Sequence, residues 1–173
     1  ERINTQIRNN ELAHAQLNME KASQLFPDSP FISLAFGKIS IQKQDFESAL
    51  MYAIQANEQD RTNLESYRFL GQAYQAMGMF TESLDPLLVF TTHSPTKDPL
   101  ALAWLADAYA ANNMMDKAIE LYDEAISEDK FAVEVYLKRG QMYLNSENFQ
   151  AAFNDFEMAY KIRPISYEAC MLL

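Results

Sequence analysis

Residues that build disulfide frameworks, metal sites and phosphate-binding loops are scarce in this chain. Its 173 residues include one cysteine, two histidines and four glycines. Cys170 has no second cysteine to pair with, and His14 and His93 are too far apart in sequence to suggest a metal-ligand cluster. The glycines do not gather into a phosphate-binding loop either. We therefore predict no metal site, no cofactor and no catalytic residues.

Positive charge is also in short supply. The chain has 14 Lys and Arg against 24 Asp and Glu, which gives a formal net charge of −10. Nucleic acids and anionic membrane surfaces are bound through clustered Lys and Arg, and the chain has no such cluster. No stretch approaches the ~18 uninterrupted apolar residues of a membrane-spanning helix. We expect neither a nucleic acid partner nor direct insertion into a membrane.

The compartment is left open by the sequence. The first ten residues have no apolar centre of the kind that a signal peptide needs, although a targeting segment could precede them. A single cysteine suits a reducing compartment and is also compatible with an oxidising one. This leaves only a slight preference for the cytoplasm.

Three of the four glycines share one spacing. Gly37 and Gly71 are 34 residues apart, and Gly140 follows two such periods later with one extra residue. A fixed period of this length predicts a stack of similar two-helix units. The windows that repeat are Tyr67-x-x-Leu70-Gly71-x-x-Tyr74, Leu102-x-x-Leu105-Ala106-x-x-Tyr109 and Tyr136-x-x-Arg139-Gly140-x-x-Tyr143.

This pattern resembles the tetratricopeptide repeat, and the resemblance covers nearly the whole chain. It implies an all-α fold, a right-handed α-solenoid of tandem helix-turn-helix hairpins. The complete repeats are residues 30–63, 64–97, 99–132 and 133–166, and each is numbered below from position 1 at its first residue. Residues 1–29 are a partial repeat, and residues 167–173 begin a further helix. We expect a single domain over residues 1–173, cut from a longer chain.

The same register explains most of the glycines and prolines. The family has small residues at positions 8 and 20, and we expect these to let the two helices of a hairpin approach closely. Gly78 falls in a turn between two helices, where a positive φ is often needed. Asp45, Thr81, Asp98, Asn148 and either Asp28 or Ser29 are candidate helix caps. Pro86 lies inside a predicted second helix and predicts that this helix is kinked or shortened.

The resemblance places partner binding on a concave groove that is lined by the first helix of each repeat. An apolar patch beside amides and a guanidinium suits a peptide or helix of a partner protein. Phe31 and Leu34 have an alternative role, which is to pack against the preceding repeat. The candidate groove residues are Phe31, Leu34, Lys38, Ile41, Arg68, Gln72, Gln75, Asp107 and Gln141, with Trp104 and Lys138 at the groove edge.

One known mode of binding in this family is not supported by the residues. The clamp that grips the C-terminal carboxylate of chaperones uses Lys at position 5 and Asn at positions 9 and 6. Position 9 holds Lys38, Gln72, Asp107 and Gln141 in this chain, and position 6 holds Ala35, Phe69, Trp104 and Lys138. We therefore expect a different partner.

The function predicted from these observations is that of a non-catalytic scaffold for protein–protein interaction. Two alternatives stay open. The chain could be the adaptor segment of a larger enzyme or of a transport or secretion machine, with the chemistry elsewhere. It could also be a structural module that associates with itself through its ends, since the apolar residues of 167–173 do not make a polar cap.

Overall fold

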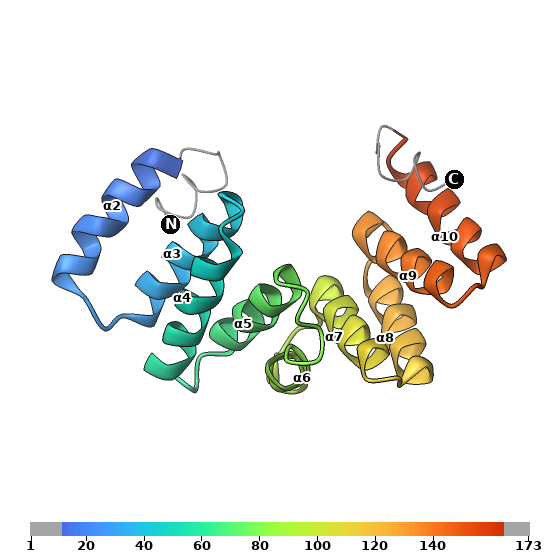
Figure 1. Ribbon diagram of the computed structural model, residues 1–173, viewed down its shortest axis with the longest axis horizontal. Coiled ribbons are helices and arrows are strands. Elements are labelled where there is room, and N and C mark those ends of the chain that lie inside the picture. Colours follow the sequence, from blue (N-terminus) through green and yellow to red (C-terminus); the bar gives the residue numbers. More distant parts are fainter. Residues whose placement is uncertain (1–11, 165–173) are drawn as a thin grey trace. The chain divides into compact units, whose positions relative to one another are not determined.

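The computed structural model describes residues 12–164, and every regular element within them is an α-helix (Figure 1). This confirms the predicted all-α fold class. The helix expected at 167–173, which contains Cys170, lies outside the described residues. So do residues 1–11 of the partial repeat expected at 1–29. The helices are α2 (Leu12–Leu25), α3 (Pro30–Gln42), α4 (Phe46–Gln59), α5 (Leu64–Ala76), α6 (Leu84–His93), α7 (Pro99–Ala111), α8 (Met115–Glu128), α9 (Val133–Asn145) and α10 (Phe149–Ile162).

The chain divides into two compact units between Phe90 and Thr91. In the first unit α3 and α4 form a hairpin, α2 packs on α3, and α5 packs on α4 and α3. In the second unit α7 and α8 form one hairpin and α9 and α10 form the next, with α9 packed on both α7 and α8 (Figure 1). Each unit is therefore a stack of antiparallel helix hairpins, the arrangement of an α-solenoid.

The four hairpin turns share one backbone design. In the first turn the Asp45 N–H donates to the Ser40 carbonyl at 2.9 Å, and the Gln44 N–H donates to Ile41 at 3.0 Å. This pair of bonds is the Schellman motif, which requires a left-handed residue just after the helix. That residue is position 15 of every repeat, and only one of the four is glycine: Gln44 (φ 60°), Gly78 (φ 72°), Asn113 (φ 61°) and Glu147 (φ 61°). The positive φ predicted for Gly78 is confirmed.

Side-chain caps begin several helices as predicted. The Asp45 carboxylate accepts from the Ser48 N–H at 3.1 Å, Asp98 accepts from Leu100 at 2.9 Å, and Asn148 accepts from Ala151 at 3.3 Å. Ser29 occupies the cap position of α3 without a side-chain cap bond. Thr81 lies three residues before Leu84, where α6 begins, so the prediction that Thr81 stands just before this helix is wrong.

Pro86 shortens the second helix of its hairpin, as predicted. The second helices α4, α8 and α10 each have 14 residues, whereas α6 has 10. Pro86 is the third residue of α6, within the first turn, where no backbone N–H needs an intrahelical acceptor. The helix therefore begins late and stays regular after the proline.

The small residues at position 8 make room for large side chains. A Cβ added to Gly140 would lie 2.5 Å from the ring of Phe156, and one added to Gly71 would lie 2.5 Å from Leu87. Both partners occupy position 24 of the same hairpin. In the first full repeat position 24 is Ala53, which is too small, and the Phe69 ring of the next repeat takes the place beside Gly37 instead. The expectation of a close backbone approach is corrected accordingly: the nearest atoms at these glycines belong to side chains.

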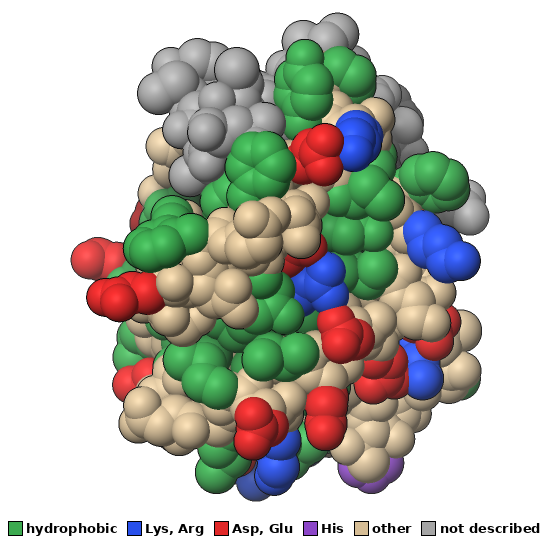
Figure 2. Space-filling view, turned by 90° about the vertical axis from the view of Figure 1, so that its right-hand side faces the viewer, with side chains coloured by type: hydrophobic (Ala, Val, Ile, Leu, Met, Phe, Trp, Pro, Cys, Tyr) green, Lys and Arg blue, Asp and Glu red, His purple; other side chains and the backbone are tan. Residues whose placement is uncertain are grey.

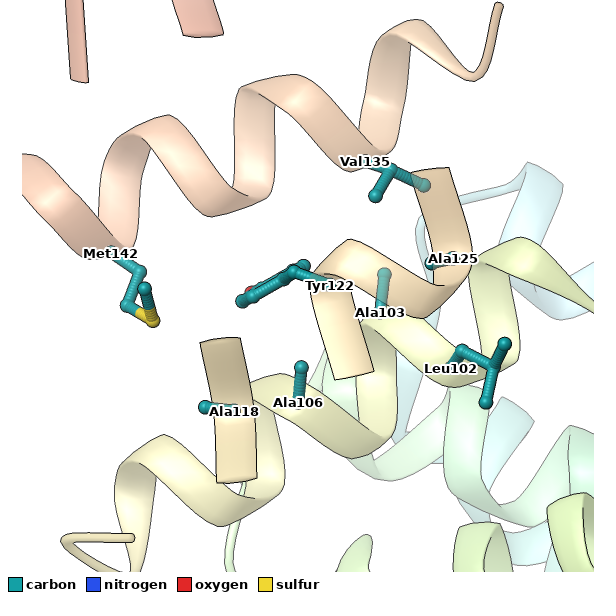
Figure 3. Packing of buried hydrophobic residues seen from close by; sticks show 8 residues of the cluster. All are labelled: Leu102, Ala103, Ala106, Ala118, Tyr122, Ala125, Val135 and Met142. Atoms are coloured by element: carbon teal, nitrogen blue, oxygen red, sulfur yellow. The ribbon is translucent and has the colours of Figure 1, made fainter. Parts of the chain in front are cut away.

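The core of the second unit is centred on one aromatic side chain. Tyr122 of α8 is fully buried between small residues of α7, such as Ala103 and Ala106, and Val135 and Met142 of α9 (Figure 3). Val135 and Met142 are seven residues apart and therefore lie on the same face of α9. These contacts fix the first helices α7 and α9 side by side, which sets the geometry of the face described next.

Candidate functional site

The predicted groove residues of the first unit differ greatly in exposure. Phe31 is 48% exposed, whereas Leu34 is 5% exposed and belongs to a cluster with Ala53 and Phe69. Ile41 is half-buried against the same cluster. Phe31 is thus accessible to a partner, and Leu34 is a core residue that a partner would reach only by displacing its neighbours.

Two of the polar groove residues of the first unit, Lys38 and Gln75, bond to side chains of other segments. The Lys38 ammonium of α3 pairs with Glu65 of α5 at 3.0 Å. The Gln75 side chain donates through Nε2 to the Ser83 hydroxyl at 2.9 Å. Arg68 and Gln72 are half-buried on α5. The two contacts hold the Lys38 and Gln75 side chains in place on α3 and α5.

Two predicted residues of the second unit, Asp107 and Lys138, take part in one local arrangement with Tyr122. The Asp107 carboxylate of α7 accepts a hydrogen bond from the Tyr122 hydroxyl and pairs with the Lys138 ammonium of α9 at 2.5 Å. Burial raises the pKa of Tyr122, and the charge of Asp107 raises it further, so the phenol remains a donor. Trp104 is only 6% exposed and so does not present its ring to solvent.

The remaining residues of this face alternate between apolar and polar side chains. Glu134, Leu137, Gln141 and Leu144 follow one another at three- and four-residue spacing, so they share one face of α9. Leu137 and Leu144 are half-buried, while Gln141 is exposed and donates to Asn145 at 2.9 Å. The result is a strip of partly exposed leucines with amide and paired charged groups beside it.

A charged cluster in the last hairpin was missed by the sequence reasoning. Arg139 of α9 donates from Nε and Nη2 to the two carboxylate oxygens of Asp155 on α10, at 2.8 and 2.6 Å, and a third nitrogen contacts Asp123 of α8. Burial disfavours the charged form of Arg139, but the two carboxylates outweigh it and raise its pKa. The available signal was Arg139 itself, which stands at position 7, where two other repeats have Leu70 and Leu105.

The described residues show no arrangement suited to metal binding or to crossing a membrane. Among residues 12–164 there is no group of three or more His, Cys, Asp and Glu side chains that could hold a metal ion. None of the helices described here is long and apolar enough to span a bilayer.

Two segments of the second unit match a known protein family. Residues 100–131 and 133–166 match the family model described as tetratricopeptide repeat. These segments are tetratricopeptide repeats, and the fold of the described residues is that of tetratricopeptide-repeat proteins. A comparison with curated protein sequences finds no match.

Several solved structures share this fold at low sequence identity. MamA is similar with a TM-score of 0.71 and 20% identity, over 95% of this chain and 95% of that one. YrrB, described as a tetratricopeptide-repeat protein with an unusual peptide-binding site, gives 0.73 and 20%, over 98% and 87%. PilF of Pseudomonas aeruginosa gives 0.77 and 13%, over 98% and 77%. At these identities the likeness is one of fold.

Proposed function

We propose that this chain is a non-catalytic interaction module that binds a peptide or helix of a partner protein on the exposed face of its first helices. The observation that carries the proposal is the face of the second unit formed by α7 and α9. On it Leu137 and Leu144 are only half-buried, and the Asp107–Lys138 pair stands between the two helices. Partly exposed leucines provide apolar anchor sites, and the polar groups beside them fix the orientation of a bound segment.

A preformed face of this kind favours binding of a flexible segment. Tyr122, Val135 and Met142 pack α7, α8 and α9 together independently of any partner. Because the face is already ordered, association carries an ordering cost on the partner's side only. The peptide-binding site named for YrrB, a protein of the same fold, is consistent with this use of the fold.

The proposal is tested by blocking the face without touching the core. Ala111 and Gln141 are both exposed on the first helices, so Ala111→Arg with Gln141→Arg adds bulk and charge there while leaving the packing intact. The matched control places two arginines on exposed positions of second helices, Ser127→Arg with Gln150→Arg. In a pull-down with native extract and mass spectrometry, proteins retained by the wild type and by the control should be lost from the blocked variant. Equal retention by all three would overturn the proposal.

Self-association is a second candidate, because the outer side of α10 carries exposed aromatic residues. Phe149, Phe153 and Tyr160 are 64, 48 and 41% exposed. Phe153 and Tyr160 occupy positions 21 and 28, which in α8 are Ile119 and Ile126, partly buried beneath α9. The view from the side of α10 shows hydrophobic patches with charged side chains between them (Figure 2).

Light scattering distinguishes this candidate from the first. An apolar face of this kind favours association between copies. The wild type should then form dimers at high concentration, and Phe153→Ser with Tyr160→Ser should be monomeric. A wild type that stays monomeric at millimolar concentration would remove self-association through α10 and leave the peptide-binding proposal untouched.

A further inference from the structure

A pocket of about 300 Å³ lies within the second unit, between the beginnings of α7 and α9. Its apolar lining includes Leu100 of α7, Val133 of α9 and Phe131 of the loop between α8 and α9. Phe131 is 77% exposed, the largest exposed fraction among the large hydrophobic residues of the described chain. The pocket is thus open to solvent beside an accessible aromatic ring.

Three carboxylates and one guanidinium also line this pocket. They belong to Asp98, Asp129, Glu134 and Arg163. Asp98 accepts from the Leu100 and Ala101 N–H groups at 2.9 and 3.2 Å, and Asp129 accepts from the Phe131 N–H at 2.8 Å. These bonds fix the orientation of two of the carboxylates, and the four charges leave the pocket with an excess of negative charge.

The pocket is continuous with the face proposed to bind a partner. Leu100 and Glu134, which both line the pocket, occupy position 2 of α7 and α9. Glu134 also lies on the same side of α9 as Leu137 and Gln141. A segment that runs along α7 and α9 therefore passes the mouth of the pocket at one end of the face.

We propose that this pocket receives a lysine or arginine side chain of the bound partner segment, an inference that rests on the proposed function. The aliphatic stem of such a residue packs against Leu100 and Val133 while its charged head pairs with the carboxylates that line the pocket. The exposed ring of Phe131 offers a further attraction to a cation. An acidic anchor is disfavoured, because three carboxylates outnumber the single guanidinium of Arg163 in the lining. The net charge of −10 also favours a basic partner at longer range.

The test is a selection of peptides from a displayed library of random twelve-residue sequences, with the full chain as the target. Selected peptides should share a Lys or Arg at a fixed distance from apolar residues. One such peptide is then synthesised with its basic residue intact and with norleucine in its place, which keeps the stem and removes the charge. Their dissociation constants are measured by fluorescence anisotropy.

The protein variant for this test removes two charges while keeping shape. Asp129→Asn with Glu134→Gln is nearly isosteric, and asparagine still accepts the Phe131 N–H, so the loop is retained. The control is Asp116→Asn with Glu120→Gln, two exposed acidic residues of α8 that do not line the pocket. The control changes the net charge by the same amount.

The expected result is that norleucine weakens binding to the wild type and to the control about tenfold, as for loss of one charged contact. The pocket variant should bind both peptides with the same weakened affinity, and its binding should depend less on salt. Selected peptides that bind the wild type, lose affinity for the Ala111→Arg, Gln141→Arg variant and show no preference for Lys or Arg would overturn the pocket assignment alone. If no peptide binds the wild type, the proposed function fails and this inference fails with it.

Discussion

Arg139 and Asp155 form a two-bond ion pair at the positions where Phe36 and Tyr52 stack in the first complete hairpin. The Arg139 side chain is 16% exposed and that of Asp155 is 6% exposed. The rings of Phe36 and Tyr52 have their centroids 5.4 Å apart and are inclined by 21°. Positions 7 and 23 of a hairpin are therefore in contact, and the last hairpin fills them with charges where another uses apolar rings.

This pair predicts a difference between single and double substitutions. Asp155→Leu alone should destabilise the protein by up to about 3 kcal/mol, because the largely buried Arg139 guanidinium then keeps only the exposed carboxylate of Asp123 as a partner. Arg139→Leu with Asp155→Leu places in this hairpin the two leucines that the preceding hairpin has at the same positions, Leu105 and Leu121. This double variant should be as stable as the wild type or more stable. Urea unfolding followed by circular dichroism measures both. A double variant as unstable as the single one would show that the pair itself stabilises the hairpin.

Substitution by glycine at position 15 of a repeat should stabilise the folded protein. Gln44 and Glu147 have φ near +60°, a region that costs a residue with a Cβ about 1 kcal/mol relative to glycine. Glu147→Gly should therefore stabilise the protein by up to ~1 kcal/mol, less the entropy that glycine loses on folding. Gly78→Ala should destabilise by a similar amount through the backbone alone, since no atom lies within 4 Å of its added Cβ. Gln42→Gly, within α3, is the control and should destabilise.

Gly140 predicts a reversal of the usual effect of alanine in a helix. Gly→Ala in a helix interior normally stabilises by about 1 kcal/mol. In α9 the new methyl would lie 2.5 Å from the Phe156 ring, so Gly140→Ala should destabilise by ~1–3 kcal/mol. Phe156→Ala removes the ring, so in the double variant the added methyl should cost little beyond the loss caused by Phe156→Ala alone. Thermal melting of the three proteins checks the coupling, and additive effects would contradict the contact.

Tyr122 predicts a loss of stability at alkaline pH. Its pKa is raised in the folded protein, chiefly by burial and then by Asp107, whereas the unfolded phenol titrates near ~10. The contribution of this group is complete below pH ~10 and is lost above it, because the unfolded chain then releases a proton that the folded protein keeps. The free energy of unfolding should fall by about 1.4 kcal/mol per pH unit for this tyrosine. Tyr122→Phe should show a shallower fall, and an unchanged slope would exclude Tyr122 as its source.

The hairpin architecture could be predicted because its determinants are local and recur. The spacing of Gly37, Gly71 and Gly140 indicated the repeat, and Asp45, Asp98 and Asn148 signalled helix starts by their own chemistry. Which side chain packs against each glycine at position 8 could not be predicted in the same way. Whether Phe156 or Phe69 fills it depends on the size of the residue at position 24, which acts through a contact between helices.

The helix that carries each candidate residue could be predicted, whereas the exposure of its side chain could not. Helical spacing puts Lys38, Asp107 and Gln141 on first helices, and they are there. Leu34 and Trp104 are buried by contacts between helices. The repeat register gives the position of a residue along its helix and does not give these contacts. The partnership of Asp107 with Tyr122 and Lys138 joins three helices and for the same reason was not visible in the sequence.

The central claim is tested most directly by a photo-crosslinking residue placed at Gln141, on the face of α7 and α9. A matched protein carries the same residue at Gln150, which is exposed on α10. After irradiation in native extract, position 141 should give a crosslinked partner that excess unlabelled wild type suppresses and the Ala111→Arg, Gln141→Arg variant does not. The same crosslinks from both positions, or suppression by both competitors, would contradict binding on this face.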